Sequence, residues 1–244
     1  MLFKPGQLMA RGKGGGVAGF NPSTLFASSE DGALFDPSDL TSLYQERTGA
    51  SATTPAGVGD VVGTMLDLSG NGNHAVAPSD AARPILRQSG GLYYLEYDGV
   101  DDEFEVFISG LSATSTYAVA INPGIDANYM LLVRGDLGAW VGAAQDSSVS
   151  AVNNNTGSPT FRRDGATFSP SNRDDLHDGL TGNTSVVVAE GADLSAWSSI
   201  RSYNSTWFLD GNIYAQLIID RAMTSDERAS LEAWLAGKSG VTLP

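Results

Sequence analysis

The chain has 244 residues, a net charge of −14 and no cysteine, and it contains 29 glycines but only 17% charged side chains. The absence of cysteine excludes disulfide bonds and thiolate chemistry. Residues 1–29 carry three basic and no acidic side chains (+3), whereas residues 30–244 carry 11 basic and 28 acidic ones (−17), so the acidic body argues against binding to nucleic acid.

The first 29 residues, called here the N-terminal arm, differ in composition from the rest of the chain. Residues 11–16 are too rich in glycine to pack a core. The arm lacks the uninterrupted apolar run of a secretory signal, and no run in the chain approaches the roughly 18 residues of a membrane span. A solvated tail is one interpretation. The other is an anchor on a larger assembly, and its contacts would be Leu2, Phe3, Lys4, Arg11, Lys13 and Phe20.

From about residue 32 onward, turn residues recur at short intervals, which predicts one all-β domain over residues 30–244. The continuously apolar stretch 213–219 should form a central strand, and residues 173–177 read as a polar loop or a short helix. The expected strands lie near residues 33–35, 61–68, 75–76, 85–87, 93–97, 103–108, 117–121, 129–133, 139–143, 149–152, 160–162, 185–189, 199–203 and 211–219.

The C-terminal segment predicts an amphipathic helix over residues 224–237, which either Gly237 or Gly240 can end. Thr224 and Glu227 have the spacing of a capping box, in which each satisfies the other's backbone N–H. Apolar residues then follow at i, i+3 and i+4, with Trp234 among them, and form one face. We expect this face to pack on the β domain, with Trp234 as a core anchor and not as a ligand platform.

Two turns rich in Gly, Asn and Asp stand out, in residues 66–75 and 95–102. Asn71-Gly72 and Asp98-Gly99 are dipeptides that accept positive φ, so both segments suit tight turns after strands. Related segments are residues 36–46, 58–63, 81–86 and 220–227.

Together these motifs resemble the concanavalin A-like (laminin-G-like) domains of virion proteins from tailed bacteriophages and gene transfer agents. The resemblance covers roughly residues 33–243 and leaves the N-terminal arm without a matching motif. It implies a jelly-roll sandwich of two antiparallel sheets with an extended N-terminal arm and one C-terminal helix. It also implies a structural protein, most simply a capsid decoration or head-fibre-type protein.

Such a protein would lie on the virion surface after assembly in the host cytoplasm, form a homo-oligomer there and contact other capsid or tail subunits. The alternative is a tail fibre or receptor-binding adhesin that recognises a host surface glycan. Because this fold hosts lectins, hydrolases and inert modules, its sites must decide the function.

Oxygen-bearing side chains alternate along the first turn, at Asp67, Ser69, Asn71 and Asn73. Calcium takes several such ligands, and Asp98, Asp101 and Asp102 could add more if the two turns converge. The favoured interpretation is an Asx-turn, in which these side chains satisfy local backbone N–H groups. We therefore expect no cofactor, with Asp67, Asn71, Asp98 and Asp101 as weak calcium candidates.

Catalytic patterns are weak. His74 and His177 are the only histidines, no nucleophile elbow accompanies them, and their spacing does not suit a two-histidine zinc site. Glu103 and Glu105 would share one strand face, but the compact Glu-x-Asp-x-x-Glu pattern of jelly-roll glucanases is missing. We expect no enzyme activity, and polysaccharide hydrolysis is the least favoured alternative.

Aromatic side chains in serine-rich surroundings could contact sugars. Trp197, Tyr203 and Trp207 offer faces on which sugar rings can stack. Core packing and loop filling are the simpler roles for the same residues.

Overall fold

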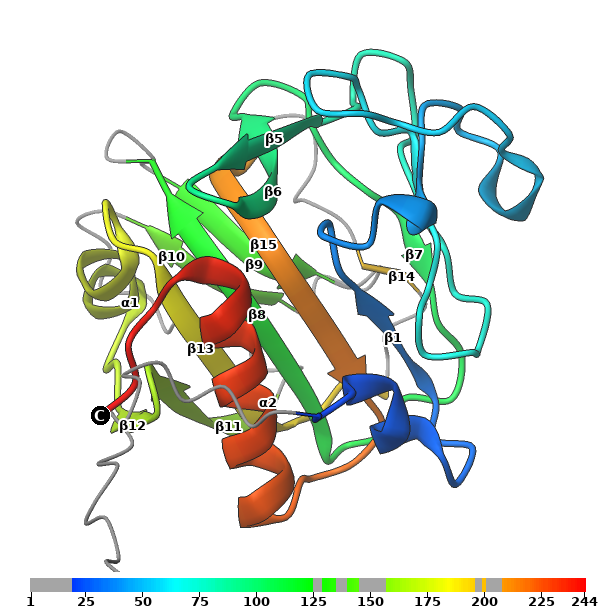
Figure 1. Cartoon of the computed structure of the whole chain (residues 1–244). Helices are drawn as coiled ribbons and strands as arrows, with labels where there is room; N and C mark the ends of the chain where they lie inside the picture. Colours follow the sequence, from blue (N-terminus) through cyan, green and yellow to red (C-terminus); the bar gives the residue numbers. More distant parts are fainter. Residues whose placement is uncertain (1–18, 125–128, 135–139, 145–156, 196–198, 201–207) are drawn as a thin grey trace, which may run out of the picture.

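The computed structural model describes residues 19–124, 129–134, 140–144, 157–195, 199–200 and 208–244, and residues 129–134, 140–144 and 199–200 are described by their backbone alone (Figure 1). Within these residues the chain is mostly β structure with antiparallel pairings and two α-helices. The same residues include no helix long and apolar enough to cross a membrane.

The helices and strands of the described residues have the following bounds. Three short 3-10 helices are η1 (Pro22–Phe26), η2 (Leu40–Ser42) and η3 (Gly49–Ser51), and the α-helices are α1 (Arg173–Leu180) and α2 (Ser225–Ser239). The strands are β1 (Gly32–Phe35), β2 (Leu43–Tyr44), β3 (Thr64–Met65), β4 (Ala75–Val76), β5 (Ile85–Ser89), β6 (Leu92–Asp98), β7 (Val106–Phe107), β8 (Ser115–Pro123), β9 (Tyr129–Arg134), β10 (Trp140–Ala144), β11 (Gly157–Arg163), β12 (Ala166–Phe168), β13 (Ser185–Ala192), β14 (Ser199–Ile200) and β15 (Asp210–Ile219).

One large sheet organises the molecule. Its strand order is β12-β11-β13-β8-β15-β6-β5, and β1 pairs with β15 as the eighth strand. One edge of β15 pairs with β8, while its other edge is shared between β6, opposite Asp210 to Ile213, and β1, opposite Gln216 to Ile219. Smaller sheets are formed by β9 with β10, β7 with β14, and β2, β3 and β4. The predicted central position of residues 213–219 is therefore confirmed.

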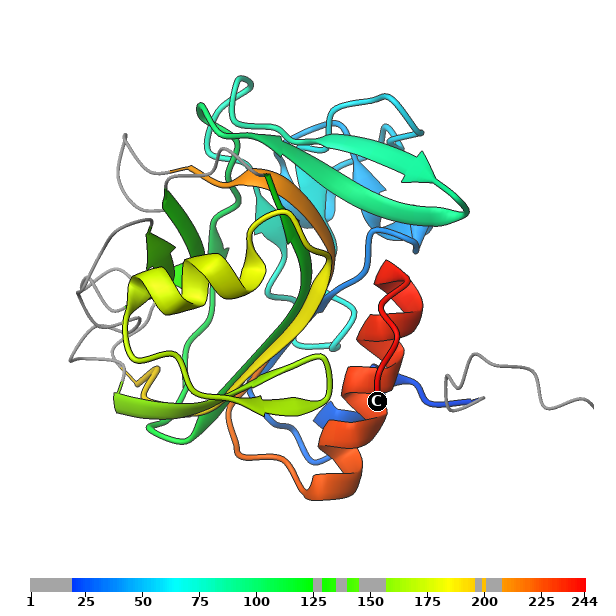
Figure 2. The same ribbon diagram turned by 90° about the vertical axis from the view of Figure 1, so that its left-hand side faces the viewer.

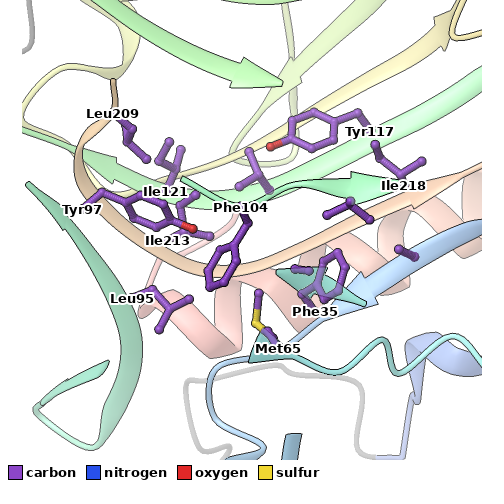
Figure 3. Packing of buried hydrophobic residues seen from close by; sticks show 14 of the residues in the cluster. Phe35, Met65, Leu95, Tyr97, Phe104, Tyr117, Ile121, Leu209, Ile213 and Ile218 are labelled. Carbon is purple, nitrogen blue, oxygen red and sulfur yellow. The ribbon is translucent and has the colours of Figure 1, made fainter. Parts of the chain in front are cut away.

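Both faces of the large sheet are buried, which explains why its central strands lack a simple alternation of polar and apolar residues. On β8, Tyr117, Val119 and Ile121 join a core that also holds Phe35, Met65 and Phe104 (Figure 3). Ala118 and Ala120 face the other way, into a second cluster beneath α2. Their small side chains allow the helix to pack closely on this face.

Helix α2 covers one face of the sheet and lies across β8, β13 and β15 (Figures 1 and 2). The predicted capping box is present: Thr224 Oγ1 accepts the Glu227 N–H at 3.2 Å, and Glu227 Oε2 accepts the Thr224 N–H at 2.8 Å. The helix ends at Ser239, two residues beyond the predicted range, and Gly240, the second of the two glycines expected to end it, closes it with φ at 77°. Leu231 and Leu235 are buried, as the apolar face predicted.

The inner part of the N-terminal arm packs with the β domain. Asn21 caps η1 by accepting the Ser23 N–H, and Pro22 occupies the first turn. Leu25 and Phe26 are buried in the cluster beneath α2, and Phe20 packs against the same cluster. Among the described residues, packing with the β domain thus extends back to Phe20, about ten residues before the boundary predicted at residue 30.

Other differences from the predicted elements have local causes. Of residues 61–68 only Thr64–Met65 forms a strand, although Val61 makes one β-bridge to Ile85. The two-residue strand β2 and the short β12 were not predicted, because neither shows an alternating pattern. Residues 173–177, for which a polar loop or a short helix was predicted, belong to the helix α1. The predicted strand at 149–152 lies outside the described residues.

Candidate interaction site and the polar turns

The Asp67 carboxylate is the centre of the first polar turn. It is buried, and it accepts the N–H groups of Ser69 at 2.8 Å and Asn73 at 3.0 Å, together with the Ser69 hydroxyl at 2.7 Å. It also accepts the Leu34 N–H at 3.0 Å, which ties the turn to β1. Four donors therefore surround this carboxylate, as the Asx-turn interpretation requires.

The other side chains of this turn also make structural hydrogen bonds. Asn71 Nδ2 donates to the carbonyls of Glu30 and Gly32, and Asn73 Nδ2 donates to the Gly32 carbonyl at 2.7 Å. His74 Nδ1 accepts the Asp67 N–H at 3.1 Å. The alternating polar residues thus connect the turn to the start of β1, and His74 helps to hold the turn in place.

The second polar turn is held in the same way. Asp98 Oδ1 accepts the N–H groups of Val100 and Asp101, while Asp102 Oδ2 accepts the Asp98 N–H at 2.9 Å. Asp102 is only 5% exposed. Burial raises the pKa of Asp102 to about 7, and the negative charges of Asp98, Asp101 and Glu96 add to the rise against the lowering effect of the Asp98 N–H. The neighbouring Tyr97 hydroxyl is also buried, which raises its pKa.

Two groups of side chains bring three potential metal ligands within 4.8 Å of one another. One is Asp98, Asp101 and Asp102, and the other is Asp174, His177 and Asp178 on α1. Asp67 belongs to neither group, so the two polar turns do not share a site within the described residues. Since calcium takes six to eight oxygens, three carboxylates, of which Asp98 and Asp102 also accept turn N–H groups, provide an incomplete set.

Glu103 and Glu105 precede β7 and lie beside the core. Both are half-buried, and the Glu105 backbone pairs with Val76 in an isolated β-bridge. The side chains on either side of Glu105, Phe104 and Val106, are buried. This alternation is that of a half-buried strand, and neither carboxylate lines any of the three hollows described below.

A groove runs along the outer side of α2, and we call it the α2 groove. It has a volume of about 410 Å³, with one wall from α2, a second from the turn between β5 and β6, and Phe20 at its border. Its lining residues are Phe20, Ser38, Gly91, Leu92, Tyr93, Ser230, Ala233, Trp234, Gly237 and Lys238. A second hollow of about 330 Å³ is also bordered by Phe20 and Trp234, and Asp36 and Asp39 line it as well.

Lys238 fixes the end of the α2 groove through a polar cluster. Its Nζ lies 2.5 Å from Asp36 Oδ2 and donates to Ser38 Oγ at 2.6 Å. The same ammonium lies 5.2 Å from the centre of the Trp234 ring, within cation–π range. Trp234 packs against the core cluster with one part and borders the groove with another, so it is not only the core anchor predicted from the sequence.

A polar hollow of about 450 Å³ is lined by residues that include Glu46, Arg47 and Asp80. Its charged groups are already paired: Arg47 Nε donates to Asp80 at 2.9 Å, and Glu46 accepts the N–H and hydroxyl of Thr54. The Thr54 hydrogen bonds hold the pKa of Glu46 at about 2. These contacts give the hollow a structural role in joining three loops.

Several predicted site residues lie outside the described residues. These are the arm residues Leu2, Phe3, Lys4, Arg11 and Lys13 and the aromatic residues Trp197, Tyr203 and Trp207. Of the predicted anchor residues, Phe20 alone is described, and it borders the α2 groove. The other groove residues were not singled out from the sequence, although Gly237 inside an amphipathic helix was a signal that could have pointed to them.

No family model and no curated protein matches the chain. Among solved structures it is similar to a GH54 α-L-arabinofuranosidase soaked with a cyclic sulfate inhibitor, with 12% identity and a TM-score of 0.42. The alignment covers 90% of this chain and 66% of the enzyme, so the chain spans just under two thirds of that protein's length. A likeness at this TM-score supports no argument about fold or activity.

Proposed function

We propose that this protein is a structural component of a virion of a tailed bacteriophage or gene transfer agent. Its N-terminal arm attaches to the capsid or to another virion subunit, and its β domain, a concanavalin A-like jelly roll, faces outward. A capsid decoration or head-fibre-type protein is the form we favour. The polar motifs at 66–75 and 95–102 support this reading because they resemble those of such domains.

One observation carries the proposal: the last part of the N-terminal arm is held at a fixed position on the β domain. Arg221 Nη2 donates to the Leu25 carbonyl at 3.2 Å, and the same guanidinium binds Glu227 at 2.8 Å and Glu30 at 3.3 Å. Together with the burial of Leu25 and Phe26, these contacts hold η1 against α2. If the part of the arm that precedes η1 binds another virion subunit, these contacts hold the whole β domain to that subunit.

The polar residues of the two turns and of the Glu46 hollow also have structural roles, as expected for a domain without a catalytic site. The carboxylates of Asp67 and Asp98 accept backbone N–H groups of their own turns. The charged groups of the Glu46 hollow are paired with one another or with threonine. In a hydrolase, by contrast, two carboxylates face a cleft that binds the sugar.

Particles produced in their own host test the proposal. A variant that lacks residues 2–18 should be absent from purified particles, whereas the same variant should unfold at a temperature close to that of the full chain. A matched variant replaces Gly14, Gly15 and Gly16 by Ser, which keeps the length, charge and apolar residues of the arm, and it should be incorporated normally. Protein gels and electron microscopy of the particles measure both.

Incorporation of the deletion variant at the level of the full chain would contradict attachment through the arm. Particles that retain this variant but no longer adsorb to the host would support the receptor-binding adhesin instead. A glycan array with the full chain then identifies the sugar.

A further inference from the structure

The α2 groove presents apolar side chains that the described part of the fold does not cover. Leu92, Tyr93 and Trp234 are half-buried and face a hollow of about 410 Å³. Apolar surface of this kind, with polar groups such as Ser38 and Lys238 at its edge, is typical of a docking site for a chain segment.

Gly237 indicates that a chain segment packs closely against α2 in this groove. It lies within α2, on the exposed side, and a Cβ at this position would meet no atom within 4 Å. Its backbone does not need positive φ, whereas Gly240 does, at 77°. A glycine inside a helix is less stable than alanine, so the described fold gives no reason for it. A segment that packs against the bare helix backbone does give one.

The position of Phe20 indicates that the N-terminal arm of the same chain occupies the groove. Phe20 borders the α2 groove, so the chain that precedes Gly19 starts at the edge of the groove. Residues 1–18 include the apolar side chains Leu2, Phe3, Leu8 and Met9, which can cover the apolar lining of the groove. Residues 10–18 include four glycines, and a glycine-rich segment of nine residues spans on average about 15–18 Å.

Charge favours the same occupant. Residues 1–18 carry Lys4, Arg11 and Lys13 and no acidic side chain. Asp36 and Asp39 line the hollow on the far side of Phe20, and Lys238, the one cation at the groove, is paired with Asp36 within the described residues. The basic segment therefore meets no unpaired positive charge there. A tether this short also gives a high effective concentration, so a chain binds its own groove before that of another copy.

We infer that residues 2–9 dock in the α2 groove of the same chain when the protein is free, with their apolar side chains over Gly237 and Trp234. This inference does not depend on the proposed attachment to a virion, because it concerns the isolated protein. If both hold, attachment to a particle requires the arm to leave the groove, and docking keeps its apolar side chains covered until then.

Crosslinking of the full chain tests the inference directly, because the natural sequence has no cysteine. The variant Leu8→Cys with Gly237→Cys places one thiol on the arm and one in the groove. The control pair is Leu8→Cys with Ser79→Cys, which lies on an exposed loop. With a short bis-maleimide in dilute protein, the groove pair should form a crosslink within one chain about tenfold faster than the control pair.

A second variant shows whether the apolar side chains cause the docking. Replacing Leu2, Phe3 and Met9 by Ser leaves the packed domain unchanged, and it should slow the groove crosslink to the rate of the control pair. Equal rates for the two pairs, an unchanged rate after the serine substitutions, or crosslinks that join two chains would each overturn the inference. None of these measurements involves particles, so their failure is distinct from a failure of the proposed function.

Discussion

The Asp67 carboxylate accepts the backbone N–H of Leu34 at 3.0 Å and so joins a turn to a strand that lies 33 residues earlier in the chain. Three further donors from Ser69 and Asn73 complete its surroundings. Because Leu34 lies on β1, which pairs with β15, this one side chain connects the polar turn to the large sheet. The turn therefore stabilises the fold by holding residues 67–73 against β1.

Replacement of Asp67 by Asn should lower the free energy of unfolding by about 2–3 kcal/mol, because hydrogen bonds to a buried charged acceptor are lost or weakened. Urea unfolding monitored by circular dichroism measures the change. The control is Asp39→Asn, which alters the exposed cap of η2 and should cost about 1 kcal/mol or less. Equal losses for the two variants would contradict the role given to Asp67.

Gly32 should tolerate no side chain. Its φ is +144°, and a Cβ there would collide with the Ile218 carbonyl across the β1–β15 pair. Gly32→Ala should therefore cost about 3 kcal/mol in the free energy of unfolding, from backbone strain and from overpacking together. Gly59→Ala is the matched control, since φ is +96° but a Cβ would meet open space, and it should cost about 1 kcal/mol. Similar losses would mean that close packing at Gly32 is unimportant.

Arg221 should hold the inner part of the N-terminal arm in place. Lysine at this position keeps the charge but cannot bind Glu227 with two parallel hydrogen bonds, as the guanidinium does at 2.8 and 3.0 Å. Arg221→Lys should cost about 1–2 kcal/mol and speed amide hydrogen exchange in residues 22–28. Arg87→Lys changes an exposed pair with Glu96 and should leave exchange in these residues unchanged. No difference between the two variants would contradict the clamp.

The features that could be predicted from the sequence are those that arise between near neighbours. Thr224 and Glu227 form their capping box because both partners lie within one turn of helix. The Asx-turn at Asp67 was favoured for the same reason. Asn21 and Pro22 gave a similar signal for η1, with a capping side chain and a proline in the first turn. The glycine-rich composition of the segment before them nevertheless led to a predicted start of the β domain at residue 30, later than the packing of η1 indicates.

The candidate groove could not be predicted, because its parts meet only in the folded protein. Lys238 and Asp36 lie about 200 residues apart, and their ion pair depends on how α2 sits on the sheet. Phe20 and Trp234 border the same hollow for the same reason. The periodicity of α2 gave its buried face but could not show that its other side, at Gly237, borders a groove.

Burial of Asp102 should make the protein less stable as the pH rises. The pKa of Asp102 is raised to about 7 in the folded chain from an ordinary value of 3.8. Between pH 4 and 7 the unfolded chain therefore loses this proton while the folded chain keeps it, so the contribution of Asp102 to the free energy of unfolding falls as the pH rises through this range. At pH 8 the cost reaches up to about 4 kcal/mol, since each pKa unit corresponds to about 1.4 kcal/mol.

Asp102→Asn should remove this dependence, because an amide oxygen can still accept the Asp98 N–H but carries no charge. At pH 8 the variant should have a higher free energy of unfolding than the natural chain, by about 2–4 kcal/mol. At a pH well below 3.8 the two should be alike, since Asp102 is then neutral in both states. Asp101→Asn removes a less buried charge from the same turn and should leave most of the slope. If the difference in the free energy of unfolding between the natural chain and Asp102→Asn, measured by urea unfolding, does not change between pH 4 and 7, Asp102 ionises without cost and its surroundings open to water.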